Sequence, residues 1–464
     1  MKNIFILFIS ILVLSSCNED FTDLAPISNR NEADFYNTEN DFVSAINASY
    51  AGLQKNGVYG RAYWLMFEMR GDNTDQGPDA TGLSRVYAEI NAFTEDALNE
   101  QITAAWTGSY SVIANCNVIL ARINAVEMDA NIKNRIIGEA LFLRSLMYYH
   151  LAVAFGNIPL QITPFTPGDG LTQVDASTVY AQIRADLVTA ETNLAVSYGV
   201  SDEGRATKGA AATLLAKVLL TINLKSDAEI VLRRIKDTYG YDLVDDYAEL
   251  WGVANENNKE SIFEIQYLSG GIGQGSAFTN DFSPSAFLQT GQGFGRNRPT
   301  EVLANSFVPG DLRFNPSMGT SYVNATGATI LANYVRKYES NPPTENDSDN
   351  NFVVFRYADV LLMLAEAIGE STEAYDLINE VRDRADLPNI DATTPGTFAE
   401  KLLKERQLEL AFENHRWPDL KRFGVAAQRV NAAEPFISQT SVRNLFFIPQ
   451  REMDINTNFN QNTN

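Results

Sequence analysis

Apolar residues recur at helical spacing along most of the chain. One stripe, at positions i, i+1, i+4, i+5 and i+8, consists of Leu214, Leu215, Val218, Leu219 and Ile222, and Thr207 is placed to cap its helix. The same criterion predicts helices over residues 42–53, 102–123, 133–155, 177–194, 227–239, 357–370, 372–384 and 398–414. Consecutive antiparallel helix pairs of this kind are typical of tetratricopeptide-like repeats, although the linear period is interrupted here.

Two stretches lack this periodicity. Residues 59–91 begin with aromatics and pass into a polar loop, and the glycine-rich residues 269–295 contain several phenylalanines. Alternating residues predict a strand over 260–267 and a second short strand over 333–338. Long irregular segments are uncommon unless they are functional or disordered, and these keep too many aromatics for simple disorder. We therefore expect residues 59–91 and about 260–350 to form a ligand-side loop region.

A regular charge pattern marks the helix nearest the C-terminus. Glu405, Glu409 and Glu413 are spaced four residues apart between apolar faces, which places them along one seam inside a packed region. The helix is expected to end where Pro418 follows Trp417, because the residue before a proline is disfavoured in the α conformation.

The seam allows two interpretations. Carboxylates one helical turn apart lie roughly 5–6 Å apart at Cβ, about the separation that a retaining glycosidase needs. Alternatively, the acids form a structural network in which each is paired with an arginine. Arg406 and Arg416 lie three residues from Glu409 and Glu413, and a general acid needs an unpaired carboxyl. The sequence therefore favours the network.

Composition excludes several classes of function. The 464-residue chain has a formal charge of −22, so nucleic acid and anionic lipid surfaces are poor partners. Two cysteines and two histidines leave no disulfide framework and no three-histidine zinc site. The acidic segments 72–75 and 345–351 could offer oxygen ligands to Ca²⁺, but neither has EF-hand spacing, and solvated loops are favoured. We expect no catalytic residue, no metal and no cofactor, since nucleotide-binding and catalytic motifs are absent.

The start of the chain has the pattern of an exported protein. Residues 1–16 contain an apolar run from Ile4 to Leu14, which is too short to span a bilayer and predicts a signal peptide. The small residues Ser15 and Ser16 before Cys17 resemble a lipobox, which predicts that Cys17 is acylated and becomes the mature N-terminus. The alternative is an ordinary signal peptide followed by a coincidental cysteine.

A family resemblance rests on blocks that follow one another in order. The run E-R-Q-L-E-L-A-F-E-N-H-R-W-P-D-L-K-R-F-G resembles the C-terminal signature of the SusD/RagB family of outer-membrane nutrient-binding lipoproteins. Four more blocks agree, at residues 138–160, 204–220, 355–367 and 447–456. The resemblance implies a mainly α fold, a right-handed tetratricopeptide-like solenoid with long irregular loops and a few short β-strands. It also implies a single SusD-like domain over 17–464, with a tether at 17–40 and helical repeats at about 40–240 and 355–424.

The resemblance further implies a function. Members sit over a SusC-like, TonB-dependent outer-membrane transporter, so a cell-surface, lipid-anchored protein that binds a glycan and delivers it to that partner is expected. The acidic Asn18-Glu19-Asp20 after Cys17 agrees with surface export in this family. A RagB-type peptide cargo, a helical scaffold that binds only proteins and a helical glycoside hydrolase remain as alternatives.

Candidate ligand residues come from the two loop segments. In this family the turn Glu68-Met69-Arg70-Gly71-Asp72-Asn73 recurs near the ligand region, followed by an aromatic and an amide. Sugars need an aromatic face for their C–H surface and polar side chains for their hydroxyls. The expected binding residues are Asp72, Asn73, Tyr87 and Asn91, then Phe278 and Phe294. An aspartate that only caps its own turn is the alternative for Asp72.

The lipid anchor can be tested directly. Cys17→Ala should move the protein from the membrane fraction to the soluble fraction, because the acylated side chain would be lost, while the circular dichroism spectrum stays unchanged. Recovery of the variant in the membrane pellet would contradict the assignment.

Overall fold

The computed structural model describes residues 35–76, 84–166, 170–284, 293–324 and 326–463. The predicted signal peptide, Cys17 and most of the predicted tether lie outside this part of the chain. The described residues are mainly helical and contain four two-stranded sheets. The predicted fold class, a helical protein with a few short strands, is therefore confirmed.

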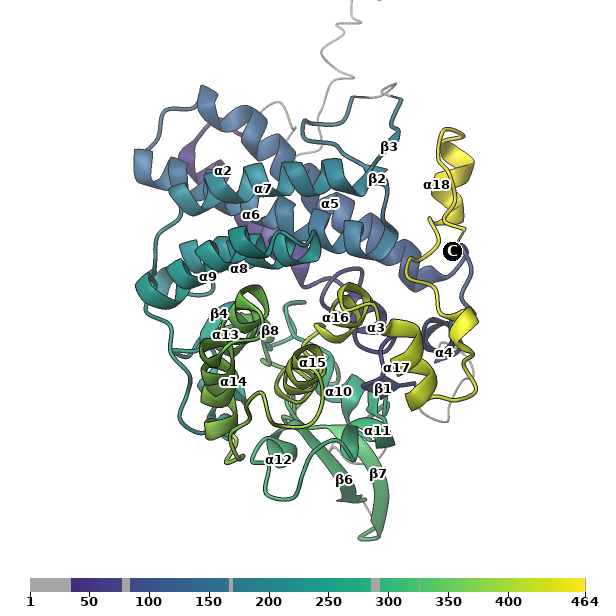
Figure 1. Cartoon of the computed structure of the whole chain (residues 1–464). Helices are drawn as coiled ribbons and strands as arrows, with labels where there is room; N and C mark the ends of the chain where they lie inside the picture. Colours follow the sequence, from purple (N-terminus) through teal and green to yellow (C-terminus); the bar gives the residue numbers. More distant parts are fainter. Residues whose placement is uncertain (1–34, 77–83, 167–169, 285–292, 325, 464) are drawn as a thin grey trace, which may run out of the picture.

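The N-terminal half builds a stack of long helices (Figure 1). Each of them packs against the next in chain order, and their ends lie close to the predicted ones. Thr207 caps the fifth long helix as expected, since its hydroxyl accepts a hydrogen bond from the Ala210 N–H. The helices are α2 (Glu39–Leu53), α5 (Glu100–Arg122), α6 (Ala130–Phe155), α7 (Ala176–Asn193), α8 (Lys208–Thr221) and α9 (Lys225–Thr238).

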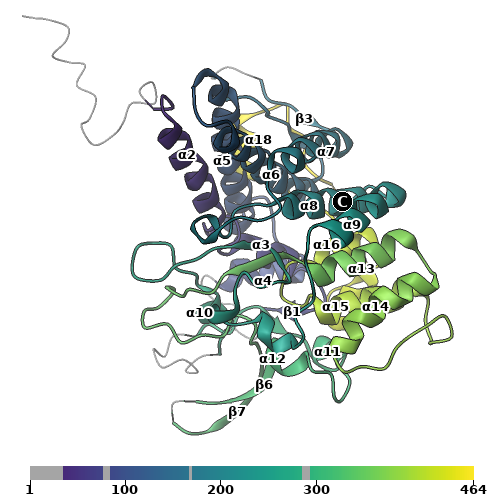
Figure 2. The same ribbon diagram turned by 90° about the vertical axis from the view of Figure 1, so that its left-hand side faces the viewer.

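The stack continues after the loop region. Helix α13 (Tyr357–Ile368) packs against α9, and α14 (Thr372–Arg384) and α15 (Phe398–Glu409) follow it. Figure 2 shows α13, α14 and α15 beside α9, although the chain has passed through the whole loop region in between. The two predicted sets of helical repeats thus form one continuous layer.

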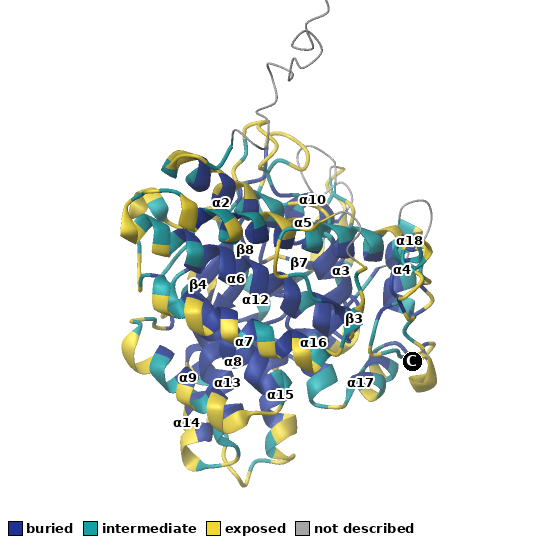
Figure 3. Cartoon of the chain, turned by 90° about the horizontal axis from the view of Figure 1, so that it is seen from above, coloured by how far each residue is buried: buried dark blue, intermediate teal, exposed yellow. Residues whose placement is uncertain are grey.

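Helix α6 lies at the centre of the protein. It is long and apolar enough by length and composition to cross a membrane, but 94% of its most apolar window is buried inside the protein. Figure 3 shows α6, α8 and α13 in the buried interior, whereas α9 and α14 carry exposed residues at the edge. The apolar composition of α6 is therefore explained by its packing in the core.

The loop region is held together by antiparallel strand pairs. Strand β4 (Ser261–Ile265) pairs with β8 (Phe352–Arg356), as the predicted strand over 260–267 anticipated. The hairpin of β6 (Met318–Val323) and β7 (Thr329–Val335) projects at the lower end of Figure 1. The second predicted strand is misplaced, because β7 ends at Val335 and does not reach residue 338. The shorter pairs are β1 (Thr74–Asp75) with β5 (Arg298–Pro299) and β2 (Ile158–Pro159) with β3 (Gln173–Val174).

Short helices occupy much of the sequence expected to be irregular. Residues 59–91 contain α3 (Ala62–Phe67) and most of α4 (Ser84–Ala92), and residues 269–295 contain α10 (Phe278–Phe282). They were missed because helices this short show no clear periodicity. The others are α11 (Glu301–Ala304), α12 (Phe314–Ser317), α16 (Arg416–Arg422), α17 (Ala426–Ala433) and α18 (Gln450–Ile455).

The seam helix ends earlier than predicted. Helix α15 stops at Glu409, and Phe412 and Asn414 adopt left-handed φ angles of 70° and 65°. Pro418 does not end a helix but lies in the first turn of α16, where a proline is tolerated because its missing N–H would have no helical partner.

Trp417, in α16, is fully buried and its ring centroid lies 5.7 Å from that of Phe93. Trp417→Ala should lower the free energy of unfolding by about 3–5 kcal/mol, because the truncation leaves a cavity in the core. Urea denaturation followed by circular dichroism measures the loss. The matched control is Phe436→Ala, whose side chain is 74% exposed and whose removal should change stability by less than ~0.5 kcal/mol. Equal effects of the two truncations would contradict the packing account.

Candidate functional site

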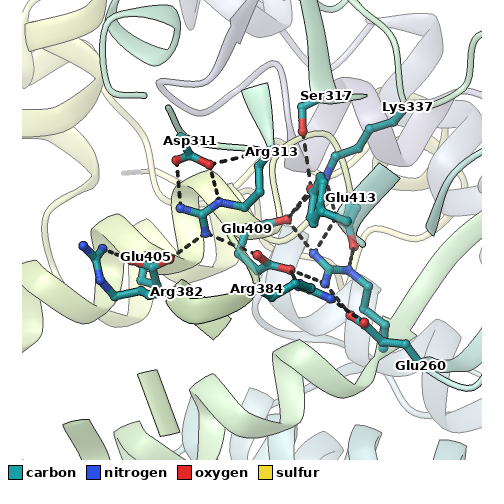
Figure 4. Close-up of polar contacts among 12 residues, drawn as sticks. Glu260, Asp311, Arg313, Ser317, Lys337, Arg382, Arg384, Glu405, Glu409 and Glu413 are labelled. Carbon is teal, nitrogen blue, oxygen red and sulfur yellow. Dashed lines mark hydrogen bonds and ion pairs between the residues drawn. The ribbon is translucent and has the colours of Figure 1, made fainter. Parts of the chain in front are cut away.

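The glutamate seam is a closed network of ion pairs (Figure 4). The Glu405 carboxylate accepts from Arg313 at 2.6 Å and Arg382 at 2.7 Å. Arg356 lies between Glu409 and Glu413 and is paired with both. Arg384 and Arg313 also reach Glu409, and Lys337 donates to Glu413 at 2.6 Å. Each of these carboxylates is therefore bound by at least two cations.

The predicted partners of the seam are wrong. Arg406 points away from Glu409 and pairs with Asp419 at 2.8 Å and Asp359 at 2.7 Å. Arg416 pairs with Asp72. Sequence spacing failed for Arg416 because α15 ends before Glu413, so these two residues do not share one helix.

The electrostatics exclude a catalytic acid in the seam. Burial alone would raise the pKa of Glu409, but Arg384, Arg356 and Arg313 outweigh burial and hold that pKa well below its usual value. Arg356 and Lys337 likewise lower the pKa of the buried Glu413 carboxyl. A general acid needs a protonated carboxyl that substrate can reach. The seam offers neither, so it is structural.

The turn at Glu68 to Asn73 joins the loop region to the segment after α15. Glu68 accepts from the backbone N–H groups of Phe412 and Asn414 at 3.0 and 3.2 Å. Burial raises the pKa of Glu68 to about 7, although these bonds and the Asn73 amide oppose the shift. Asp72 accepts from two of the three guanidinium nitrogens of Arg416, so it forms an ion pair and is not a simple turn cap.

Two of the expected ligand residues, Asp72 and Asn73, are buried and bonded to other side chains of the protein. Asp72 and Asn73 are each 1% exposed. The Asn73 side chain donates to Glu68 and accepts from Gln407, both at 2.9 Å. In this conformation neither side chain can reach a ligand.

Tyr87 and Asn91 lie on helix α4, not on an exposed loop. Tyr87 is 1% exposed, so the expectation that its ring is free to stack on a sugar is wrong for this structure. The Asn91 amide donates to Glu434 at 2.6 Å and its oxygen accepts from the Gln76 N–H. Burial raises the pKa of Glu434 to about 7, a shift that the Asn91 hydrogen bond opposes.

Aromatic rings of the loop region pack on one another. Phe278 is fully buried and stacks on Phe282, whose ring lies 5.2 Å from that of Trp64. Trp64 is in turn 6.5 Å from Tyr87. The rings were expected to serve a ligand because a helical stack has no use for them, but they form the core of the loop region itself.

Phe294 is the exception among the six expected residues, with 39% of its surface exposed. The Arg296 guanidinium lies 4.4 Å from the Phe294 ring centroid and 5.0 Å from that of Tyr87. Asp281 pairs with Arg296 and fixes its position. An aromatic ring supported in this way presents a rigid apolar face beside a polar edge.

The two expected loop segments do meet. Strand β1, from the first segment, pairs with β5, which follows the second, and Arg298 binds Asp75 across them at 2.9 Å. Arg296 and Asp281 were not identified as site residues from the sequence. Their charge could have indicated a role, because they are the only charged residues from position 269 to position 296.

The acidic segment 345–351, one of the two considered for Ca²⁺, binds backbone N–H groups of a neighbouring loop. The Asp347 carboxylate accepts from the N–H groups of Gly270 and Gly271, and Asp349 accepts from that of Ser269. Within the described ranges, no group of three or more histidine, cysteine or acidic side chains could hold a metal ion. The segment 345–351 therefore clamps a glycine-rich loop and is not simply solvated.

Comparisons with known proteins agree on one family. Residues 315–464 match the model described as SusD family, and residues 20–220 match that described as starch-binding associating with outer membrane. SusD-like protein P2 of Formosa agariphila is 29% identical, over 91% of this chain and 91% of its own. A laminarin-binding SusD-like protein of known structure is 28% identical, with a TM-score of 0.81 over 92% of this chain and 99% of its own. A SusD superfamily structure from Bacteroides vulgatus is 25% identical, with a TM-score of 0.80 and the same coverage.

The seam predicts a stability phenotype. Glu409→Gln should lower the free energy of unfolding by about 3–5 kcal/mol, because buried arginines lose their carboxylate. The folded-state pKa of Glu409 lies below its usual value of 4.5. The difference from wild type should therefore be complete above about pH 4.5 and shrink as the pH falls through the lowered pKa. Urea denaturation at several pH values measures it.

Glu373→Gln is the matched control, because Glu373 also receives two hydrogen bonds from one arginine, Arg233, but is 52% exposed. Its removal should leave stability nearly unchanged. A seam variant as stable as wild type would contradict the structural role, as would a loss of ligand affinity at unchanged stability.

Proposed function

This chain belongs to the SusD/RagB family of non-catalytic, outer-membrane-associated binding proteins, and from that premise we propose that it binds a glycan at the cell surface and delivers it to a SusC-like, TonB-dependent transporter. The similarity to a laminarin-binding SusD-like protein over 92% of the chain supports a glycan cargo. The acylated Cys17 would hold the protein at the outer membrane, and the mature residues 17–464 would act as one domain. In support of that unit, the larger of two buried apolar clusters among the described residues includes residues from Phe42 to Phe459.

The observation that carries the proposal is the supported, exposed ring of Phe294. A sugar stacks its C–H face on such a ring and places its hydroxyls against neighbouring polar groups. Arg296 and Asp281 hold the ring from beneath, so little side-chain freedom is lost on binding. Asp72, Asn73, Tyr87, Asn91 and Phe278 would then contribute by supporting this face from within, and not by touching the ligand.

Isothermal titration of the wild-type protein against laminarin oligosaccharides, other neutral and acidic glycans, and peptides tests the cargo. Binding of a glycan with no binding of peptides is the expected result. Binding of peptides alone would favour the RagB-type alternative, and co-purification of a TonB-dependent transporter with the membrane-anchored protein would support delivery.

Phe294→Ala should weaken glycan binding roughly five- to 150-fold, the effect of losing a stacking aromatic worth ~1–3 kcal/mol. The melting temperature should hardly move, since the ring is 39% exposed. Phe165→Ala removes another exposed phenylalanine, 57% exposed and outside the loop region, and should leave affinity unchanged. Equal affinities of Phe294→Ala and wild type would remove this face from the proposal.

A further inference from the structure

A surface hollow is lined in part by Trp251. Its volume is about 700 Å³, within the range of ~300–1,000 Å³ typical of ligand sites. Residues from the segment 248–252, from helix α12 and from the segment after β7 line it. Phe294 does not line it. The lining includes Trp251, Asn315, Arg336, Lys337, Ser340 and Asn341.

Trp251 is held at the surface by its local backbone. The 3-10 helix Tyr247–Leu250 ends just before it, and Gly252 follows with a φ of 94°, a conformation that favours glycine. The Trp251 ring contacts Tyr338 with a centroid distance of 6.2 Å, and Tyr338 contacts Phe282 at 5.8 Å. The indole also contacts Tyr247 at 5.9 Å, so it is packed against the rings of the interior.

Lys337 restricts the movement of the Trp251 ring. Its ammonium lies 4.4 Å from the indole centroid and is fixed by Glu413 at 2.6 Å. Lys337 is 1% exposed and its ammonium lies over the indole, so the ring is held in place where it lines the hollow. A preorganised ring lowers the entropy lost on binding.

The charged side chains that line the hollow take part in ion pairs. Arg336 pairs with Glu339 at 3.0 Å, and Lys337 is occupied by the seam. The side chains of Asn315 and Asn341 have no hydrogen-bond partner within the described residues and are exposed. Two free amides beside one aromatic ring match the hydroxyls and C–H face of a sugar.

From this geometry we infer that the hollow is a second glycan-binding subsite, specific for uncharged saccharides, with Trp251 as its stacking platform. Acidic glycans are disfavoured because Arg336 and Lys337 are already paired with Glu339 and Glu413 and the protein carries a formal charge of −22. A peptide would find few apolar contacts, since Trp251 is joined only by Ala248 and Pro316 as apolar lining. The inference rests on the proposed function and adds a location and a ligand class to it.

Titration of single variants with laminarin oligosaccharides and other neutral oligosaccharides, and with their uronate-containing counterparts, tests the subsite. Trp251→Ala should weaken binding at one of two sites by ~10-fold or more, and Trp251→Phe should restore most of it. The double variant Asn315→Ala/Asn341→Ala should weaken the same site by roughly fivefold. Both amides are exposed and unbonded, so this variant keeps its fold even if Trp251→Ala does not. Gln428→Ala removes an exposed amide on α17 and should bind like wild type.

The outcomes separate this inference from the proposed function. If wild type binds a neutral oligosaccharide and both the Trp251→Ala and the double asparagine variants bind it equally well at every site, the subsite is overturned while glycan binding stands. Preference for uronate-containing glycans or for peptides would overturn the ligand class. Failure of the wild-type protein to bind any saccharide would overturn both proposals.

Discussion

The need to pair charges that are buried together organises this protein. Removing a carboxylate from water is costly unless cations and hydrogen bonds surround it. The Glu409 carboxylate is paired with arginines from separate elements. Arg356 ends β8, Arg384 ends α14, and Arg313 directly precedes α12. All of these elements must therefore take one arrangement around α15. The network joins the helical stack to the loop region, which a stripe of apolar residues could do with less geometric specificity.

The loop region is also attached to the segment after α15, and this attachment depends on the early end of that helix. Because the chain turns through left-handed conformations at Phe412 and Asn414, their N–H groups are released from helical bonding and are accepted by Glu68. Asp72 binds Arg416 two residues further on. The turn from Glu68 to Asn73 thus attaches the loop region to the segment after α15, with carboxylates where a ligand site was expected.

Helices were predictable from sequence because stripes and caps are local signals, as Thr207 illustrates. The seam glutamates were also identified, but their partners were not, since Arg313 and Arg356 are distant in sequence and spacing cannot reveal them. The site was predicted by residue type, which carries no information on burial. Trp251 was not singled out from the sequence, although the glycine that follows it indicated a turn.

The chain of rings explains how one fold can present different surfaces. Rings in its middle, such as Phe282 and Trp64, contact neighbours on several sides, so changing them opens a cavity in the core. Phe294 and Trp251 are partly exposed, although Trp251 also packs against Tyr247, Tyr338 and Lys337. Substitution of Phe294 therefore alters the surface chemistry at less loss of packing than substitution of a ring in the middle. Relatives of known structure with 25–28% identity and a TM-score near 0.8 can therefore share the interior while differing in the side chains at the surface.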